Sequence, residues 1–137
     1  MRVTCKINSG KGLPSKHFAV FRGETEKTVF NVSTGKEYPV FGMALWQGAI
    51  ILLLVDDTDK PNWYSLELFA VSDPRLPSDW LFSNTVAVEH DVEAIWGYER
   101  LATDPQHYEG LIERHRNAVE AFEKERQKAG LKVFGEK

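Results

Sequence analysis

A cluster of carboxylates, Asp56, Asp57 and Asp59, follows an apolar run and is the clearest candidate for metal or charge chemistry in the sequence. Clustered carboxylates bind Ca²⁺ or Mg²⁺ when their spacing fits a coordination loop. A calcium loop counted from Asp57 places Pro61 at its third ligand position and Leu68 where a bidentate glutamate belongs. The sequence therefore predicts a solvated turn held by Asx hydrogen bonds, with no metal and no other cofactor.

A glycine-rich stretch at residues 9–16, SGKGLPSK, has the composition of a phosphate-binding loop. The phosphate motif ends in Gly-Lys-Ser/Thr at the start of a helix, whose N–H groups hold the anion. Here Lys16 is followed by His17 and by residues typical of a strand. We therefore interpret the stretch as a plain basic loop.

Nucleophilic and acid–base residues do not form a catalytic pattern. The four histidines show neither an HExxH spacing nor a pairing with cysteines. The single cysteine, Cys5, lies in an alternating stretch without an evident base, and no Gly-x-Ser-x-Gly motif occurs. The sequence thus predicts a protein that is not an enzyme, with Cys5 in its core.

Charge is unevenly distributed along the chain. Residues 38–104 carry a net charge of −8, against +4 for residues 1–37 and +1 for residues 105–137. The acidic middle also contains all four tryptophans. Because phosphates require a basic face, this distribution disfavours nucleic-acid binding. It favours binding to a basic surface of another protein.

Aromatic residues beside acidic ones supply the candidate binding residues. Tyrosine and tryptophan act well as interface anchors, and neighbouring carboxylates pair with the partner's cations. The residues predicted to bind the partner are Asp56, Asp57, Asp59, Trp63, Tyr64, Asp79 and Trp80.

The elements that must position these residues begin with a hairpin. Residues 49–55 are apolar throughout, and their seven-residue length is far below the roughly 20 residues that span a membrane. They follow Gln47-Gly48, a turn typical of a two-residue hairpin. We therefore predict a central strand at 49–55 that is buried on both faces. Further strands are predicted at 2–8, 18–22, 27–33, 37–46, 63–71 and 80–88, while 92–101 fits either a helix turn or an edge strand.

A long helix is predicted at residues 104–130. Asp104 is a good N-cap, Pro105 suits the first helical position, and apolar residues recur at three- and four-residue spacing. The far end, past Phe122, is expected to project. Residues 1–137 thus form one predicted domain, mainly β over 1–103, with the C-terminal helix and a tail at 131–137.

Several short motifs between residues 27 and 82 carry a family resemblance. They include Tyr38-Pro39-Val40-Phe41-Gly42-Met43, Pro61-Asn62-Trp63-Tyr64 and Leu76-Pro77-x-Asp79-Trp80. This pattern resembles small bacterial SH3-like proteins of uncertain role, some of which accompany toxins as immunity proteins. The resemblance implies an α+β fold with a small, strongly bent antiparallel SH3-like β-barrel followed by one long C-terminal α-helix. It implies no catalytic residue.

These observations predict a noncatalytic protein–protein binding module of the immunity or inhibitor type, which masks a basic site on a partner such as a toxin. The first residues lack the apolar centre of a secretory signal and only one cysteine is present, so a cytoplasmic location is expected. A small-ligand enzyme with its site in the barrel mouth is one alternative. Another is an SH3-like nucleic-acid-binding module that uses the basic N-terminal third, namely Lys6, Lys11, Lys16, Arg22 and Lys27.

Overall fold

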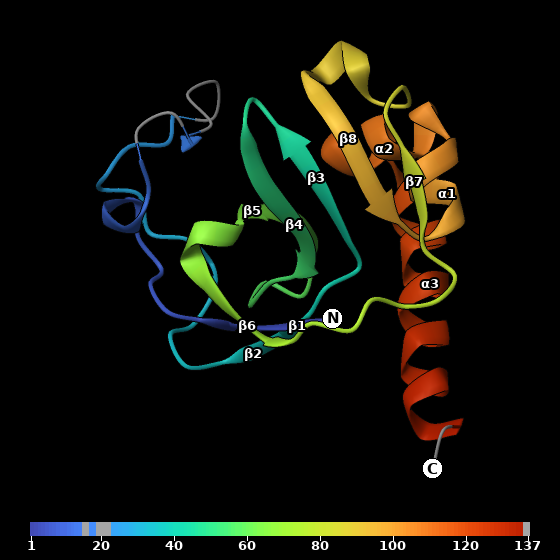
Figure 1. The fold of residues 1–137 in the computed structure, drawn as a ribbon, viewed down its shortest axis with the longest axis horizontal. Helices are drawn as coiled ribbons and strands as arrows, with labels where there is room; N and C mark the ends of the chain where they lie inside the picture. Colours follow the sequence, from blue (N-terminus) through green and yellow to red (C-terminus); the bar gives the residue numbers. More distant parts are fainter. Residues whose placement is uncertain (15–16, 19–22, 136–137) are drawn as a thin grey trace.

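The computed structural model describes residues 1–14, 17–18 and 23–135, with side chains beyond Ala129 left out. The protein has an α+β fold with two antiparallel sheets and three α-helices in this described part (Figure 1). A three-stranded sheet has the order β2 (Glu37–Pro39), β1 (Arg2–Cys5), β6 (Phe69–Asp73). A five-stranded sheet has the order β5 (Pro61–Ser65), β4 (Ala49–Val55), β3 (Gly42–Trp46), β8 (Val92–Gly97), β7 (Leu81–Ser83).

The α+β class is confirmed, but the strands form two sheets and not a closed barrel. The predicted strand at 63–71 is interrupted by a 3₁₀ turn, η4 (Leu66–Leu68). Ser65 caps this turn, because its side chain accepts a hydrogen bond from the Glu67 backbone N–H at 3.2 Å. After the turn, β6 leaves the larger sheet and pairs with β1. This change of sheet explains why the barrel is absent.

The hairpin and its buried strand are confirmed. Trp46 pairs with Ala49 across a two-residue turn, in which Gln47 and Gly48 both have positive φ angles, 48° and 79°. Positive φ at both positions matches the twist of the flanking strands. On one face of β4, Leu52 packs in a cluster that includes Val3 and Tyr38. On the other face, Leu53 packs in a second cluster with residues of the helices. The strand therefore lies between two hydrophobic cores.

Other predicted strands are wrong or shortened. Residues 27–33 form no strand, and only an isolated bridge joins Val29 to Ser9. The strand at 80–88 is reduced to β7, and the 3₁₀ turn η5 (Val88–His90) follows it. The ambiguous stretch 92–101 contains β8, an interior strand, and then the start of α1 (Glu99–Thr103). The strand predicted at 18–22 falls mainly on residues 19–22, which lie outside the described residues.

The single long helix is also wrong, because the chain forms α2 (Pro105–Ile112) and α3 (Arg116–Gly135) after α1. The predicted cap is confirmed, since Asp104 Oδ1 accepts a hydrogen bond from the Gln106 N–H at 3.0 Å. The break falls where Arg114 adopts a φ of 61°. A Cβ on Gly110 would lie only 2.7 Å from the Ala118 Cβ. An uninterrupted helix would separate these positions by about 12 Å, so this close packing requires the turn.

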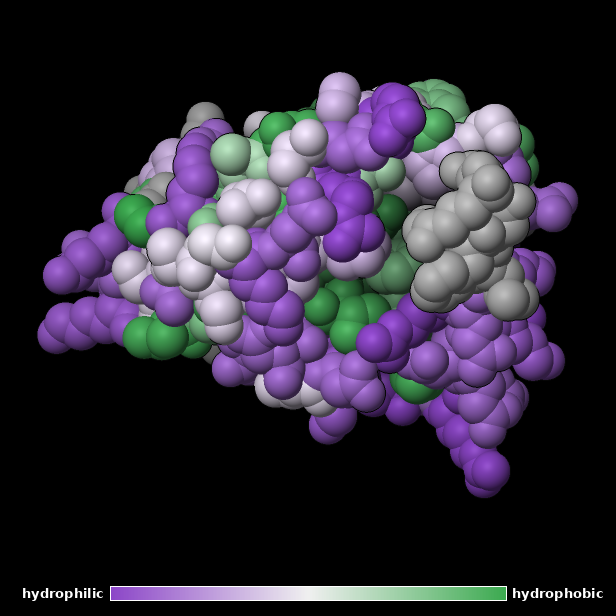
Figure 2. All heavy atoms as spheres, turned by 90° about the horizontal axis from the view of Figure 1, so that it is seen from below, coloured by the Kyte–Doolittle hydropathy of each residue, from purple (hydrophilic) through white to green (hydrophobic). Residues whose placement is uncertain are grey.

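The helices lie on one side of the sheets, and the last turns of α3 extend beyond them (Figure 1). The face seen from below carries mostly hydrophilic residues, with hydrophobic ones gathered in a hollow near its middle (Figure 2). Among the described residues, no helix combines the length and apolar character needed to cross a bilayer.

Candidate functional site

A pocket of about 330 Å³ lies where the larger sheet meets α2 and the N-terminal segment. Its volume falls at the lower end of the range for small-molecule sites. β4 and β5 form one side of the pocket, and α2 forms a second side. The β3–β4 turn and the segment before β8 form a third side. The N-terminal segment completes the lining. The lining residues are Leu13, His17, Glu24, Phe30, Trp46, Gln47, Ile51, Leu53, Pro61, Asn62, Trp63, Tyr64, Ser65, His90, Asp91, Tyr108, Leu111 and Ile112.

Aromatic rings form much of the pocket wall. The Tyr108 ring lies between two others, with centroid separations of 5.9 Å to Trp63 and 5.4 Å to His90. Phe30 and Tyr64 form an edge-to-face pair with centroids 6.0 Å apart. These rings come from β5, α2, η5 and the N-terminal segment. Only the folded chain brings them together.

Two polar atoms at the pocket have no hydrogen-bond partner among the described residues. Trp63 Nε1 and His17 Nδ1 are both buried and both unpaired. An indole N–H can only donate, and leaving a buried donor unpaired costs about 1–3 kcal/mol. Two residues of the lining thus each keep one buried polar atom that the described part of the chain does not satisfy.

Asp91, which lines the pocket, has a carboxylate side chain and a backbone conformation that is rare outside glycine. Asp91 adopts a left-handed φ of 62° directly after η5. Its Oδ2 accepts a hydrogen bond from the Gln47 side-chain amide at 3.3 Å, and its backbone oxygen accepts one from the Gln47 N–H at 3.4 Å. The hairpin tip and the segment before β8 therefore hold this carboxylate at the pocket.

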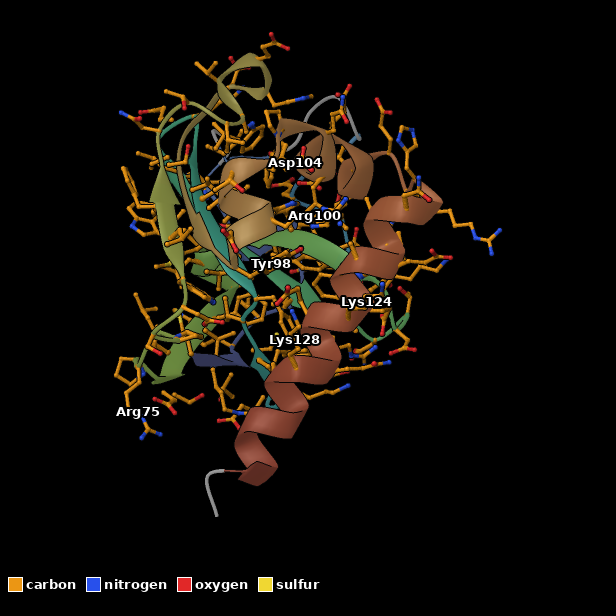
Figure 3. The ribbon with its side chains drawn as sticks, turned by 90° about the vertical axis from the view of Figure 1, so that its right-hand side faces the viewer. Arg75, Tyr98, Arg100, Asp104, Lys124 and Lys128 are labelled. Atoms are coloured by element: carbon orange, nitrogen blue, oxygen red, sulfur yellow. The ribbon has the colours of Figure 1, made fainter. Side chains whose placement is uncertain are left out.

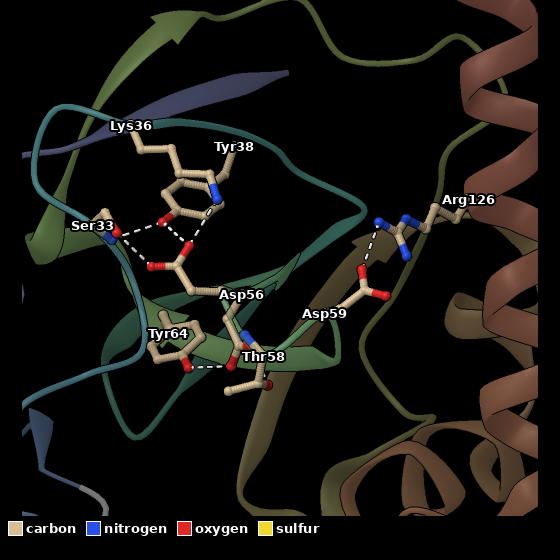
Figure 4. A network of polar contacts seen from close by, with 9 residues as sticks. Ser33, Lys36, Tyr38, Asp56, Thr58, Asp59, Tyr64 and Arg126 are labelled. Carbon is tan, nitrogen blue, oxygen red and sulfur yellow. Dashed lines mark hydrogen bonds and ion pairs between the residues drawn. The ribbon is translucent and has the colours of Figure 1, made fainter.

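The first residue of the predicted acidic cluster, Asp56, is inside the protein and only 4% exposed. Its carboxylate accepts a hydrogen bond from Asn62 Nδ2 at 2.7 Å. It also accepts bonds from Tyr64 Oη at 2.6 Å and from the backbone N–H and hydroxyl of Thr58 (Figure 4). Burial alone would raise the pKa of Asp56. The bonds from Thr58, Tyr64 and Asn62 outweigh it and hold the pKa below its usual value. A partner cannot reach this carboxylate without opening the network.

The other two acids of the cluster are exposed but engaged. Asp57 accepts hydrogen bonds from Lys36 Nζ at 2.8 Å, Ser33 Oγ at 2.6 Å and Tyr38 Oη at 2.8 Å. The hydrogen bond from Lys36, followed by that from Ser33, lowers the pKa of Asp57 to about 2. Asp59 pairs with Arg126 of α3 at 3.0 Å (Figure 4). The Asx turn that the sequence predicts is present, since the Thr58 N–H bonds to Asp56 Oδ1 at 2.9 Å.

The seven predicted binding residues fall in three places. Asp56, Asp57 and Asp59 form the turn between β4 and β5, and Trp63 and Tyr64 line the pocket. Asp79 is exposed and Trp80 is half-buried on the segment before β7. Apolar residues with large exposed fractions lie on this segment, Leu76 at 47%, and in β7 itself, Leu81 at 43% and Phe82 at 56%.

A buried titratable pair lies under α1 and is not part of the pocket. Tyr98 Oη and His107 Nε2 are 2.6 Å apart. Burial raises the pKa of Tyr98, and burial lowers the pKa of His107 to about 4. Figure 3 places Tyr98 beside α1 together with Arg100 and Asp104, which form an ion pair at 3.6 Å on the helix surface. The pair is a packed, neutral hydrogen bond and supplies no reactive group to a cavity.

The basic residues of the nucleic-acid alternative divide between described and undescribed parts of the chain. Lys6, Lys11 and Lys27 are exposed, while Lys16 and Arg22 lie outside the described residues. Within those described, no three or more His, Cys, Asp or Glu side chains gather as a metal site would require.

Comparison of the chain with protein-family models, curated proteins and solved structures finds no match. The pocket therefore has to be interpreted from its own chemistry. Sequence reasoning found Trp63 and Tyr64 but missed His17, His90 and Asp91. Their only sequence signal is polarity next to turns, which many surface residues share.

Proposed function

We propose that the protein is a noncatalytic binding module of the immunity or inhibitor type, which acts in the cytoplasm by covering a basic site on a partner protein. The pocket is its principal contact site. The observation that carries the proposal is the pocket itself, a cavity with aromatic walls whose lining comes mostly from the acidic middle of the chain. The SH3-like resemblance of residues 27–82 remains part of this proposal as a prediction.

The acidic middle region and the pocket have different roles in binding. A net charge of −8 over residues 38–104 attracts a basic surface and speeds association, chiefly at low salt. Affinity then comes from desolvated contacts, which aromatic side chains in a cavity provide. In this proposal Trp63 and Tyr64 contact the partner, as their sequence context predicts. They do so as part of the pocket lining, which receives a group of the partner, and not as side chains that insert into the partner.

The exposed residues before and within β7 support a protein as the partner. Leu76, Leu81 and Phe82 are exposed apolar side chains that lie close to one another in the sequence. Phe82 packs on Trp96 with ring centroids 5.0 Å apart, which fixes its position without covering it. A second contact surface of this kind suits a protein, whereas a small molecule would need the pocket alone.

A small-molecule-binding protein is the second candidate function. It is favoured by the pocket volume of about 330 Å³. The two candidate functions differ in what occupies the pocket. A protein-binding module binds a group on the surface of a partner protein, whereas a small-molecule-binding protein binds a free ligand.

A steric block at the pocket tests the proposal. Ile112 lines the pocket and is 43% exposed, so Ile112→Trp adds bulk there without disturbing the core. Val88→Trp is the matched control, because Val88 is 63% exposed and is not among the lining residues. We expect one basic protein to bind the wild type and Val88→Trp in equal amounts from an extract of the source organism, with its binding lost in Ile112→Trp. Equal capture by both variants would refute the pocket as the contact site.

A further inference from the structure

We propose that the pocket selects an organic cation, a primary ammonium or guanidinium group carried on an apolar chain, as in a lysine or arginine side chain. This inference rests on the proposed function and specifies the chemistry that the pocket recognises. It follows from three features of the described lining: its aromatic content, its charged groups and its unsatisfied donor.

The aromatic content of the lining suits a cation. Five aromatic residues line the pocket, namely Phe30, Trp46, Trp63, Tyr64 and Tyr108. The face of an aromatic ring is electrically negative and attracts a cation placed within about 6 Å of its centre. The same rings bury the methylene chain of a lysine or arginine side chain. A lining of this kind binds both parts of such a side chain.

The described charged lining includes the Asp91 carboxylate. None of the described lining residues is lysine or arginine. Among the described residues, the only hydrogen bond to the Asp91 carboxylate comes from the neutral Gln47 amide. Arg114 lies near the edge, but its guanidinium donates to Pro61 O at 2.8 Å and Asn62 Oδ1 at 2.6 Å, on β5. Among the described lining residues, an anionic ligand would therefore meet the Asp91 carboxylate with no lysine or arginine to balance it, whereas a cation would meet a counter-ion.

The unsatisfied donor favours a cation that is attached to a polypeptide. Trp63 Nε1 has no partner among the described residues and can only donate a hydrogen bond. An ammonium group also only donates, so it cannot satisfy the indole. The carbonyl oxygen of the residue that carries the side chain can accept this bond. A lysine or arginine within a chain thus supplies both the charge and the acceptor.

Titration of the full chain with four small probes, followed by ¹H–¹⁵N NMR at pH 8, tests the inference. The probes are Nα-acetyl-lysine amide, Nα-acetyl-norleucine amide, Nα-acetyl-glutamate amide and butylamine. The Trp63 indole signal, assigned by its loss in Trp63→Phe, reports binding directly. We expect the lysine amide to bind about tenfold more tightly than the norleucine amide, since desolvated cation–π contacts are worth about that much. The glutamate amide should cause no shift.

Two charge variants test whether an ion pair between Asp91 and the ammonium group of the probe contributes to binding. Asp91→Asn should weaken lysine-amide binding about fivefold, the upper range for an ion pair at an exposed edge, and leave the norleucine amide unchanged. Asparagine tolerates the left-handed backbone of Asp91, so the fold is kept. Glu93→Gln is the matched control, because Glu93 is exposed and lies outside the lining. It should leave the affinity for the lysine amide unchanged.

Each outcome decides a separate point. Equal binding of the lysine and norleucine amides, or no shift with any probe, overturns the cation selectivity. Butylamine binding as tightly as the lysine amide keeps the cation site but overturns the polypeptide source. If Ile112→Trp abolishes partner capture and the lysine amide is not preferred, only this inference fails. If the lysine amide is preferred and partner capture ignores Ile112→Trp, only the proposed function fails.

Discussion

Removing the Tyr64 hydroxyl should destabilise the fold because it takes a donor from a buried charge. Tyr64 Oη donates to Asp56 Oδ2 at 2.6 Å, and both side chains are buried, at 8% and 4% exposed. Water therefore cannot replace the lost donor. A hydrogen bond to a charged group contributes about 1.5–3 kcal/mol to stability. Two neutral side-chain donors, from Thr58 and Asn62, remain on Asp56 in the variant. We therefore expect Tyr64→Phe to lower the free energy of unfolding by about 2 kcal/mol.

Urea unfolding at pH 7 measures this cost. With a slope of about 2 kcal/mol per molar urea, the unfolding midpoint should fall by about 1 M. Tyr38→Phe is the matched control, since Tyr38 Oη donates to Asp57 at the same kind of distance, 2.8 Å. Asp57 has a side chain that is 30% exposed and keeps Lys36 as a partner. Water can replace the lost donor there, so the control should cost less, about 1 kcal/mol or below.

The two variants also differ in how they respond to acid. Loss of the Tyr64 donor removes one of the bonds that hold the pKa of Asp56 down, so its pKa should rise in Tyr64→Phe. The Asp56 carboxyl ¹³C signal, followed from pH 7 to pH 2, measures the change. If Tyr64→Phe is no more destabilising than Tyr38→Phe, and the Asp56 pKa does not move, the assignment of a buried, ionised carboxylate is wrong.

Three further outcomes test the core, the helix packing and the acid response. Leu52→Asp should abolish cooperative unfolding in urea, because Leu52 is fully buried and an unpaired buried carboxylate costs several kcal/mol. Gly110→Ala gains about 1 kcal/mol from helix propensity, but it places the new Cβ 2.7 Å from the Ala118 Cβ, which cannot move aside. We therefore expect the free energy of unfolding to fall by about 1–2 kcal/mol, and Ala118→Gly to restore part of it. The pKa of Asp57 in the folded protein, about 2, is below its ordinary value of 3.8. The stabilising effect of the ionised Asp57 is therefore present above pH 4 and is lost as the pH falls towards 2. Lys36→Met should flatten this part of the stability–pH profile, measured by thermal unfolding, and an unchanged profile would contradict the assignment.

Local signals in the sequence predicted local structure well. The hairpin at Gln47-Gly48, the apolar strand before Asp56 and the helix cap at Asp104 each depend on residues close in sequence. The break after α2 depends on a distant requirement, the contact between Gly110 and Ala118. Because Arg114 takes a positive φ that few non-glycine residues adopt, nothing in its identity marks a turn.

The sheet arrangement escaped prediction for a similar reason. The sequence from Trp63 to Val71 predicts one strand, because residues of high strand propensity stand at both of its ends, Trp63 and Tyr64 at one and Phe69 and Val71 at the other. Trp63 pairs with Leu53 on the preceding strand, whereas Val71 pairs with Val3, which is far away in the sequence. The point where the strand breaks therefore depends on a distant segment. Pocket residues are subject to the same limit. Aromatic content identified Trp63, but no local pattern links it to Asp91 or His17.

The acidic turn, which the sequence predicts to be a docking surface, also fixes residues of the pocket wall. Asn62 and Tyr64 both line the pocket and both donate to Asp56 from neighbouring positions of β5. Asn62 also accepts a bond from Arg114, which joins β5 to the turn after α2. Asp59 adds an ion pair to α3 through Arg126.

This arrangement changes what mutation of the acids can reveal. Reversing the charges of Asp56, Asp57 and Asp59 together would remove the bonds that orient Asn62 and Tyr64, so lost binding in that variant would report a disturbed fold. Among the described residues, the Asp91 carboxylate accepts a hydrogen bond only from a neutral side-chain amide, so a change there leaves the Asp56 network intact. The carboxylate that tests electrostatic recognition is the one at the pocket edge, and not the three that form the most conspicuous cluster in the sequence.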